Sequence, residues 1–285
     1  MNSRSKNKII DKTFQFWGIA TTMLGLILLA VFIGNIVITG IERIDWDFLT
    51  NLPSRRASKA GIYTAMLGSV WILVLTAIIA FPLGVASAIY LEEYSEKNRW
   101  SKILEINISN LAGVPSIIYG LLGLEVFVRI FGFGGSVLAG SMTLALLILP
   151  IIIVSTREAI KAVPSSIKQA SFALGATKWQ TIWRQILPSS FGGILTGIIL
   201  ALSRAVGEAA PLIVVGALAY VPFAPSTPMD DFTVLPIQIF NWISRPQHAF
   251  SVNASAAIIV LLVITFTMNG IAVFFRNRWQ KKMNY

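Results

Sequence analysis

Six apolar runs limit how this chain can fold more than any other feature of its sequence. A helix needs about 20 apolar residues to cross the hydrocarbon core of a bilayer. The runs cover 14–38, 61–91, roughly 103–124, 136–156, roughly 190–212 and 251–275. Because backbone polar groups find no water inside a bilayer, the runs predict an all-α integral membrane protein with six transmembrane helices.

The composition agrees with a membrane protein and excludes several kinds of chemistry. Of the 285 residues, 55% are hydrophobic and 13% are charged, and the mean hydropathy is +0.72. A soluble domain carries about a quarter charged residues. The sequence has no cysteine and a single histidine, His248, which excludes thiolate metal sites and histidine-dependent catalytic triads. We therefore expect no catalytic residue, no metal and no cofactor bound by this chain.

The net charge of +10 is a topology signal. Most Lys and Arg residues fall on the side of the bilayer that holds both ends of a six-span chain. The positive-inside rule then places both termini in the cytoplasm. The family resemblance described below implies the inner membrane of a bacterial or archaeal cell. The charge requires no nucleic-acid partner.

The runs divide the sequence into four predicted parts, and the third contains a polar cytoplasmic loop at 157–188. The parts are a cytoplasmic N-terminal segment (1–13), a first helix with its outer loop (14–60), a core transmembrane domain (61–275) and a cytoplasmic tail (276–285).

A polar stretch within that loop, "QASFALGATKWQTIWRQILP" (169–188), has the signals of a compact pair of helices. Capping-box patterns of Ser or Thr followed three residues later by Gln begin at Ser166 and Thr177. Gly175 can adopt the left-handed conformation that ends the first helix. The second helix is expected to run to Pro188. We call the loop formed by these two predicted helices the elbow.

An apolar stripe at helical spacing follows the second predicted helix. It comprises Trp179, Ile182, Trp183 and Ile186. One interpretation is an amphipathic connector that rests on the bilayer surface. The other is a protruding elbow that docks into a cleft of a cytoplasmic partner.

The elbow resembles the cytoplasmic coupling loop of permeases from binding-protein-dependent ABC importers. That family has Glu-Ala-Ala, three residues and Gly, followed at a fixed interval by an aliphatic residue, any residue and Leu-Pro. Gln169, Ser171 and Gln185 depart from the pattern. The resemblance implies that a set of elbow residues couples this chain to an ATPase: Gln169, Ala170, Ser171, Gly175, Ala176, Trp179, Leu187 and Pro188.

Three more stretches, 110–124, 202–212 and 235–250, are similar to the A-type subunit of phosphate-specific transport permeases. This similarity implies pairing with a C-type permease in the lipid bilayer, two copies of a cytoplasmic ATP-binding subunit and an extracytoplasmic phosphate-binding protein. The chain itself has no P-loop motif. ATP and Mg are therefore expected on the partner ATPase.

Two pairs of oppositely charged residues lie four positions apart within or near the apolar runs. Arg204, expected about midway along its run, shares a helical face with Glu208. An arginine suits a tetrahedral oxyanion because its planar fork donates two parallel hydrogen bonds. The alternative is an internal ion pair between helices. Glu125 and Arg129 repeat the spacing near the outer end of the third run, where the arginine can instead reach the interface.

The third run is interrupted by Gly113 and Pro115, so we expect a kink or an unwound turn there. Irregular backbone at membrane depth must line a cavity or be buried in protein. With Arg204, Glu208, Glu125 and Arg129, Ser116 in this segment completes the predicted substrate pathway. A simple packing kink is the alternative.

The predicted function is import of inorganic phosphate, and other functions stay open. Arginine also binds sulfate, molybdate and phosphonate, so residue chemistry does not choose among these oxyanions. An ATP-independent channel or secondary carrier would suit a broken helix beside a charged pair. It would leave the elbow without a role. A purely structural subunit would tolerate neutral replacement of Arg204.

Overall fold

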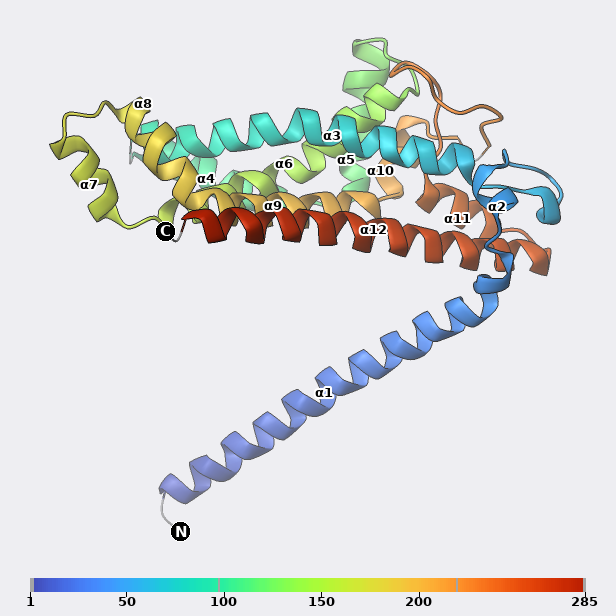
Figure 1. Ribbon diagram of the computed structural model, residues 1–285, viewed down its shortest axis with the longest axis horizontal. Helices are drawn as coiled ribbons and strands as arrows, with labels where there is room; N and C mark the ends of the chain where they lie inside the picture. The colour runs from blue at the N-terminus through green and yellow to red at the C-terminus, as the bar shows by residue number, and fades with distance from the viewer. Residues whose placement is uncertain (1–2, 97, 219, 284–285) are drawn as a thin grey trace.

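The structure is a computed structural model that describes residues 3–96, 98–218 and 220–283 (Figure 1). Its α-helices are α1 (Ser3–Gly40), α2 (Trp46–Thr50), α3 (Tyr63–Ile89), α4 (Arg99–Leu111), α5 (Ser116–Gly123), α6 (Val137–Lys161), α7 (Ser165–Ala173), α8 (Lys178–Thr181), α9 (Leu187–Val206), α10 (Ala210–Val215), α11 (Leu235–Ile243) and α12 (His248–Met283). Short 3₁₀ turns are η1 (Ile41–Arg43) and η2 (Ala57–Lys59), and π-helical segments are η3 (Tyr90–Tyr94), η4 (Leu124–Ile130) and η5 (Ile182–Ile186).

The long helices α3, α6, α9 and α12 form a bundle (Figure 1). Helices α7 and α8 lie at one end of it, which we call the elbow end, and α2, α10 and α11 lie toward the opposite end. In the described part of the chain, five helices are long and apolar enough to cross a membrane. The total is six if the bent pair of α4 and α5–η4 counts as one span, which agrees with the prediction.

Helix α6 is the centre of the bundle. It packs against α3 on one side and α9 on the other, and its Leu144, Ile148 and Ile152 are almost fully buried. The hydroxyl of Thr76 in α3 donates a hydrogen bond to the carbonyl of Ser141, at 3.2 Å. Close approach depends on small residues, as membrane helices have little hydrophobic drive to associate. A Cβ at Gly84 would lie 2.5 Å from Ile152 Cγ2.

The third apolar run is two helices rather than one. Helix α4 and the segment α5–η4 meet at an angle of 103°. Pro115 cannot donate a backbone hydrogen bond and keeps Val114 out of the helical conformation. The hydroxyl of Tyr119 in α5 donates to the carbonyl of Leu111, the last residue of α4, at 2.8 Å. The expected break is confirmed, and the third apolar run forms two helices in place of one continuous helix.

The fifth span differs from the prediction of 190–212 at both ends. One helical stretch runs from Lys178 through α8, η5 and α9 to Val206. Pro188 therefore does not end the second elbow helix as expected. It lies where the π-helical bonding of η5 gives way to α-helical bonding, so a missing N–H is tolerated. The span ends at Gly207, and Pro211 sits in the first turn of the separate helix α10.

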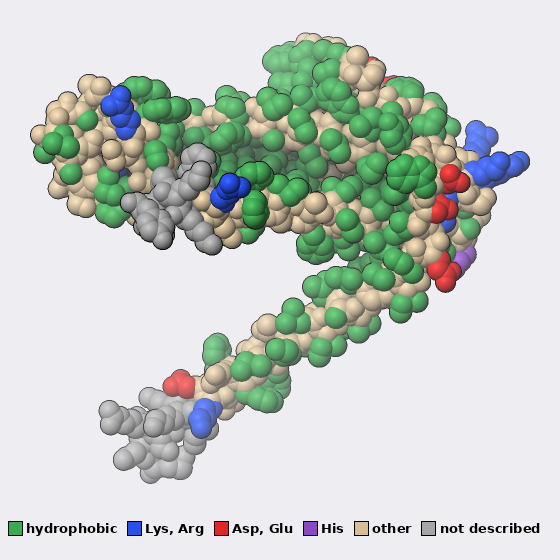
Figure 2. Space-filling model, in the orientation of Figure 1, with side chains coloured by type: hydrophobic (Ala, Val, Ile, Leu, Met, Phe, Trp, Pro, Cys, Tyr) green, Lys and Arg blue, Asp and Glu red, His purple; other side chains and the backbone are tan. Residues whose placement is uncertain are grey.

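Helix α1 leaves the bundle and carries apolar side chains along its length (Figures 1 and 2). From Ile10 to Phe32 its residues are exposed, except for the half-buried Ala20, and burial begins only near its end, where Ile36 is 8% exposed. There a Cβ on Gly40 would lie 2.5 Å from the backbone nitrogen of Ala256 in α12. The first helix is thus joined to the rest at the end opposite the elbow.

The contact between α3 and α6 predicts the effect of adding bulk at Gly84. Gly84→Val should lower the melting temperature of the purified protein, since overpacking a core costs about 1–3 kcal/mol. Combining it with Ile152→Ala should destabilise less than the sum of the two single changes. Gly25→Val is the matched control, because a Cβ at Gly25 meets nothing within 4 Å. Equal melting temperatures for the Gly84 and Gly25 variants would contradict this packing.

Candidate functional site

Arg204 and Glu208 form the predicted ion pair, with 3.4 Å between Arg204 Nε and Glu208 Oε1. Arg204 lies in the last turn of α9 rather than midway along its span, which corrects the expectation. Glu208 follows the helix cap at Gly207, so the pair closes across the end of a helix. The Arg204 side chain is 40% exposed and that of Glu208 18%. An arginine anchored on one side and open on the other is suited to binding an anion.

The broken helix lies next to this pair. Tyr119 of α5 belongs to the same buried core cluster as Ala201 and Ala205, which lie on either side of Arg204 in α9. Helix α5 packs closely on α10, since a Cβ at Gly120 would lie 2.8 Å from Pro211 Cα. Ser116, the first residue of α5, is one turn before Tyr119. The structure therefore brings the helix break and Arg204 into one region.

Glu125 and Arg129 form a second ion pair of 2.9 Å within η4. Their side chains are 57% and 65% exposed, and the pair is separate from Arg204. Exposed ion pairs of this kind contribute about 0–1 kcal/mol. Its geometry thus fits both interpretations of the sequence, a pathway contact and an interfacial arginine.

The first elbow helix begins two residues earlier than the predicted capping box indicates. Pro164 is the residue that caps α7, and no side chain in the described structure caps this helix. The capping box predicted at Ser166 and Gln169 is therefore wrong, because Ser166 already lies inside the first turn. Gln169 and Ala170 follow on the same helix, and both are exposed.

The turn between the elbow helices matches the prediction. Gly175 has a φ of +80°, the left-handed conformation. The Thr177 hydroxyl accepts a hydrogen bond from the Gln180 amide at 3.3 Å, and the Gln180 side chain accepts one from the Thr177 amide at 2.9 Å. Ser171 and Thr181 share a hydrogen bond of 2.8 Å that joins α7 to the second helix.

The apolar stripe of the second helix divides between two faces. Ile182 and Ile186, each 1% exposed, pack with Ile160 at the end of α6. Trp179 and Trp183 are exposed, and their rings stack with 5.8 Å between centroids. The helix is therefore fixed to the bundle by one face and presents aromatic rings on another.

The predicted coupling residues divide in the same way. Gln169, Ala170, Gly175 and Trp179 are exposed, whereas Ser171, Ala176, Leu187 and Pro188 are half-buried. The turn also exposes Leu174, at 90%, and Phe172, at 48%. Sequence reasoning did not single out these two apolar side chains, although large apolar residues in a polar loop are a visible signal.

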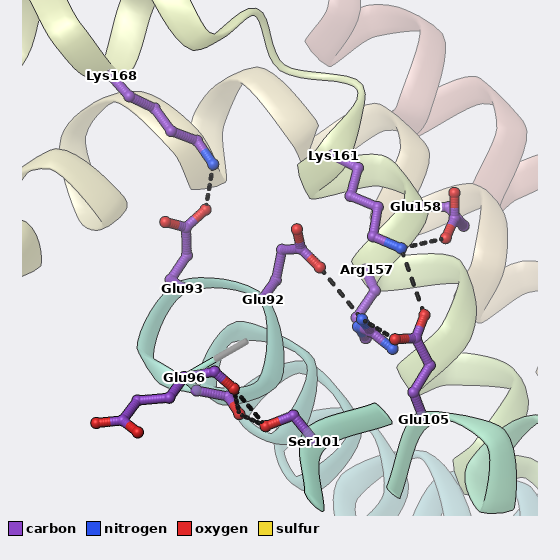
Figure 3. Close-up of polar contacts among 10 residues, drawn as sticks. Glu92, Glu93, Glu96, Ser101, Glu105, Arg157, Glu158, Lys161 and Lys168 are labelled. Carbon is purple, nitrogen blue, oxygen red and sulfur yellow. Dashed lines mark hydrogen bonds and ion pairs between the residues drawn. The ribbon is translucent and has the colours of Figure 1, made fainter. Parts of the chain in front are cut away.

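A network of ion pairs at the elbow end was also missed (Figure 3). Arg157 Nη2 in α6 lies 3.4 Å from Glu92 Oε2 in η3 and 3.2 Å from Glu105 Oε2 in α4. Lys161 pairs with Glu105 and Glu158, and Lys168 of α7 pairs with Glu93. Glu105 lies near one end of the third apolar run, and its charge there is the one local sign of a polar partner. The sequence does not identify these partners, because Arg157 and Lys161 are more than 50 positions away.

A comparison with protein families matches this architecture. Residues 80–281 fit the family described as the binding-protein-dependent transport system inner membrane component. The chain belongs to this family. It is thus a multi-pass membrane permease of the ABC importer class, as the elbow's resemblance implied.

Curated relatives of this permease cover most of its length. It is 32% identical, over 98% of its chain and 97% of the relative, to the probable ABC transporter permease protein YqgI of Bacillus subtilis. It is 34% identical to the phosphate transport system permease protein PstA 1 of Mycobacterium tuberculosis, over 79% of its chain and 73% of that protein.

A solved structure shares the fold of the permease. The crystal structure of a bacterial alginate ABC transporter, in complex with an alginate pentasaccharide-bound periplasmic protein, contains a chain with a TM-score of 0.70. The two chains are 15% identical, and the match covers 96% of each. The expected importer-type permease fold is confirmed.

The capping box of the elbow predicts a local change in stability. Thr177→Ala removes the acceptor for the Gln180 amide, and loss of such a cap costs about 1 kcal/mol. Hydrogen exchange in the segment 177–186 should therefore become about fivefold faster. Ser166→Ala is the control and should change nothing, since Ser166 does not cap α7. Equal exchange rates in both variants would show that the box is not formed.

Proposed function

We propose that this chain is a permease subunit of an ATP-driven importer of inorganic phosphate. The observation that carries the proposal is the partly exposed Arg204, anchored by Glu208 at the end of α9 and adjacent to the broken helix. The relatives named as phosphate transport permeases support this choice of anion. The chemistry of Arg204 alone also suits sulfate, molybdate and phosphonate.

The geometry of the pair supports reversible binding. Glu208 faces Arg204 through Nε, which directs the terminal nitrogens of the guanidinium elsewhere. Those nitrogens can donate two parallel hydrogen bonds to a phosphate. Glu208 competes for the same positive charge, and this competition favours release. The pair thus binds an anion and limits how long it stays.

The elbow supports coupling to a separate ATPase. Its turn presents Phe172, Leu174, Trp179 and Trp183 to the surroundings. Exposed apolar clusters of this kind on a polar segment are typical of protein interaction sites. In this proposal a dimer of cytoplasmic ATP-binding subunits holds ATP and Mg and binds the elbow. A C-type permease and an extracytoplasmic phosphate-binding protein complete the complex, and both termini are cytoplasmic.

Uptake of labelled phosphate into proteoliposomes tests the function. The vesicles contain this chain with its co-purified partners, ATP is enclosed or omitted, and the binding protein and excess sulfate are outside. We expect uptake that needs ATP and ignores sulfate. Equal uptake without ATP would indicate a channel or secondary carrier, and competition by sulfate would indicate another oxyanion.

The same assay tests Arg204. Arg204→Gln should lower uptake about 10- to 100-fold. This factor corresponds to the loss of a hydrogen bond to a charged group, which contributes about 1.5–3 kcal/mol. Arg129→Gln is the comparison, because it also breaks an ion pair with a glutamate four positions away. Normal uptake by the Arg204 variant would mean that the ion pair has no role in transport and only neutralises the two charges where helices pack together.

Gly175 tests the role of the elbow. Gly175→Val places a β-branched residue in a left-handed turn, at a cost of about 1–2 kcal/mol, and should reduce ATPase association and uptake about tenfold. Nothing lies within 4 Å of a Cβ there, so the effect comes from the backbone. Gly175→Asn should retain more activity, because Asn tolerates this conformation. Unchanged ATPase association in the Val variant would refute the proposed coupling.

A further inference from the structure

The ion-pair network at the elbow end joins four segments that are distant in the sequence (Figure 3). Segments η3, α4, α6 and α7 each contribute charged side chains to it. The proposed function uses Arg204 and the exposed surface of the elbow, and it gives this network no role. Charged groups are costly to bury, and the side chains of Arg157 and Glu93 in this network are each only 10% exposed, which calls for an explanation.

The elbow holds η3 at three points. Lys168 of α7 pairs with Glu93, whose side chain is 10% exposed. The Nζ of Lys178 in α8 lies 4.9 Å from the centre of the Tyr94 ring. Ile89, directly before η3, packs against the buried isoleucines of η5. A displacement of the elbow therefore displaces η3 as well.

Arg157 links η3 to α4. One of its terminal nitrogens contacts the carboxylates of both Glu92 and Glu105, at 3.4 and 3.2 Å. Its side chain is only 10% exposed, and its Nε is buried without a hydrogen-bond partner among the described residues. The guanidinium is thus placed by two carboxylates from different elements. If either carboxylate moves, the arginine must follow it or leave a charge unpaired.

Helix α4 continues the connection toward Arg204. Glu105 lies in the middle of α4, and the Leu111 carbonyl at its end accepts the hydrogen bond from Tyr119. Tyr119 lies in the helix after the break and belongs to the same core cluster as Ala201 and Ala205, which lie on either side of Arg204 in α9. The elbow and the surroundings of Arg204 are therefore linked through Arg157.

We propose that Arg157 is a positioning residue for transport, which relays movement of the elbow to the broken helix by holding Glu92 and Glu105 together. This inference rests on the proposed function. Arg157 does not contact the transported anion. It sets the position of α4 relative to η3, and through α4 the surroundings of Arg204.

The proteoliposome assay with the full complex tests the relay through the number of phosphate ions imported per ATP hydrolysed. Glu105→Gln should lower this ratio about tenfold, the size of a typical coupling free energy between sites, while ATP hydrolysis continues. Arg157→Lys should do the same, because it keeps the positive charge but its side chain ends short of the Nη2 position that contacts both carboxylates. Glu158→Gln is the matched control: Glu158 is 64% exposed and pairs only within α6.

A second readout follows α4 directly. The sequence has no cysteine, so a single Lys102→Cys change provides a unique label on α4 beside the network. In otherwise unchanged protein, trapping the ATPase with nucleotide and vanadate should alter the rate of maleimide labelling. Glu105→Gln and Arg157→Lys should abolish that response, and Glu158→Gln should retain it.

The outcomes separate the inference from the function on which it rests. If unaltered protein shows no ATP-dependent uptake, both fail. If it does, and both network variants import normally per ATP, the relay alone is overturned. If the variants lose uptake and ATP hydrolysis in equal proportion, the network is merely structural, and the relay is again overturned. The relay is supported if the network variants import fewer phosphate ions per ATP while ATP hydrolysis continues, and if they also lose the change in maleimide labelling.

Discussion

The close packing of α6 between α3 and α9 is the interaction on which the other helices depend. Lipid gives membrane helices little hydrophobic reason to associate, so the bundle relies on van der Waals contact and shared hydrogen bonds. Small residues such as Gly84 allow that contact, and buried hydroxyls such as Thr76 add hydrogen bonds across it. With α6 fixed, its last turns hold Arg157 against η3 and α4. The network at the elbow end is therefore a product of the core packing.

The described charges are arranged so that each functional arginine has a carboxylate partner. Arg157 is almost buried and contacts two carboxylates, whereas Arg204 is more exposed and contacts one. Desolvation strengthens the dependence of a charge on its partners. Arg157 is thus suited to holding elements together, and Arg204 to exchanging its contacts with a mobile anion. In the roles proposed above, the same residue type would serve two purposes because its surroundings differ.

Local signals in the sequence predicted local structure, and distant contacts escaped them. The turn at Gly175 and the box at Thr177 depend on residues within three positions, so their geometry could be read directly. Six spans and the permease family also followed from the sequence. Glu92, by contrast, is 65 positions from Arg157, and periodicity carries no information about such a pair. Pro188 does not end its helix, because a proline ends a helix only where the neighbouring hydrogen bonding cannot adapt.

The continuity of α8, η5 and α9 gives the elbow a mechanical reach that its size alone would not suggest. Arg204 lies 26 positions after Lys178 on this single stretch, or about 40 Å at 1.5 Å per residue. Such a rod behaves as a lever arm. A tilt of about 4° around its elbow end would sweep the guanidinium through about 3 Å, which is the length of a hydrogen bond. In the proposed function, so small a change of angle would be enough to make or break an anion's contacts at the far end of the rod.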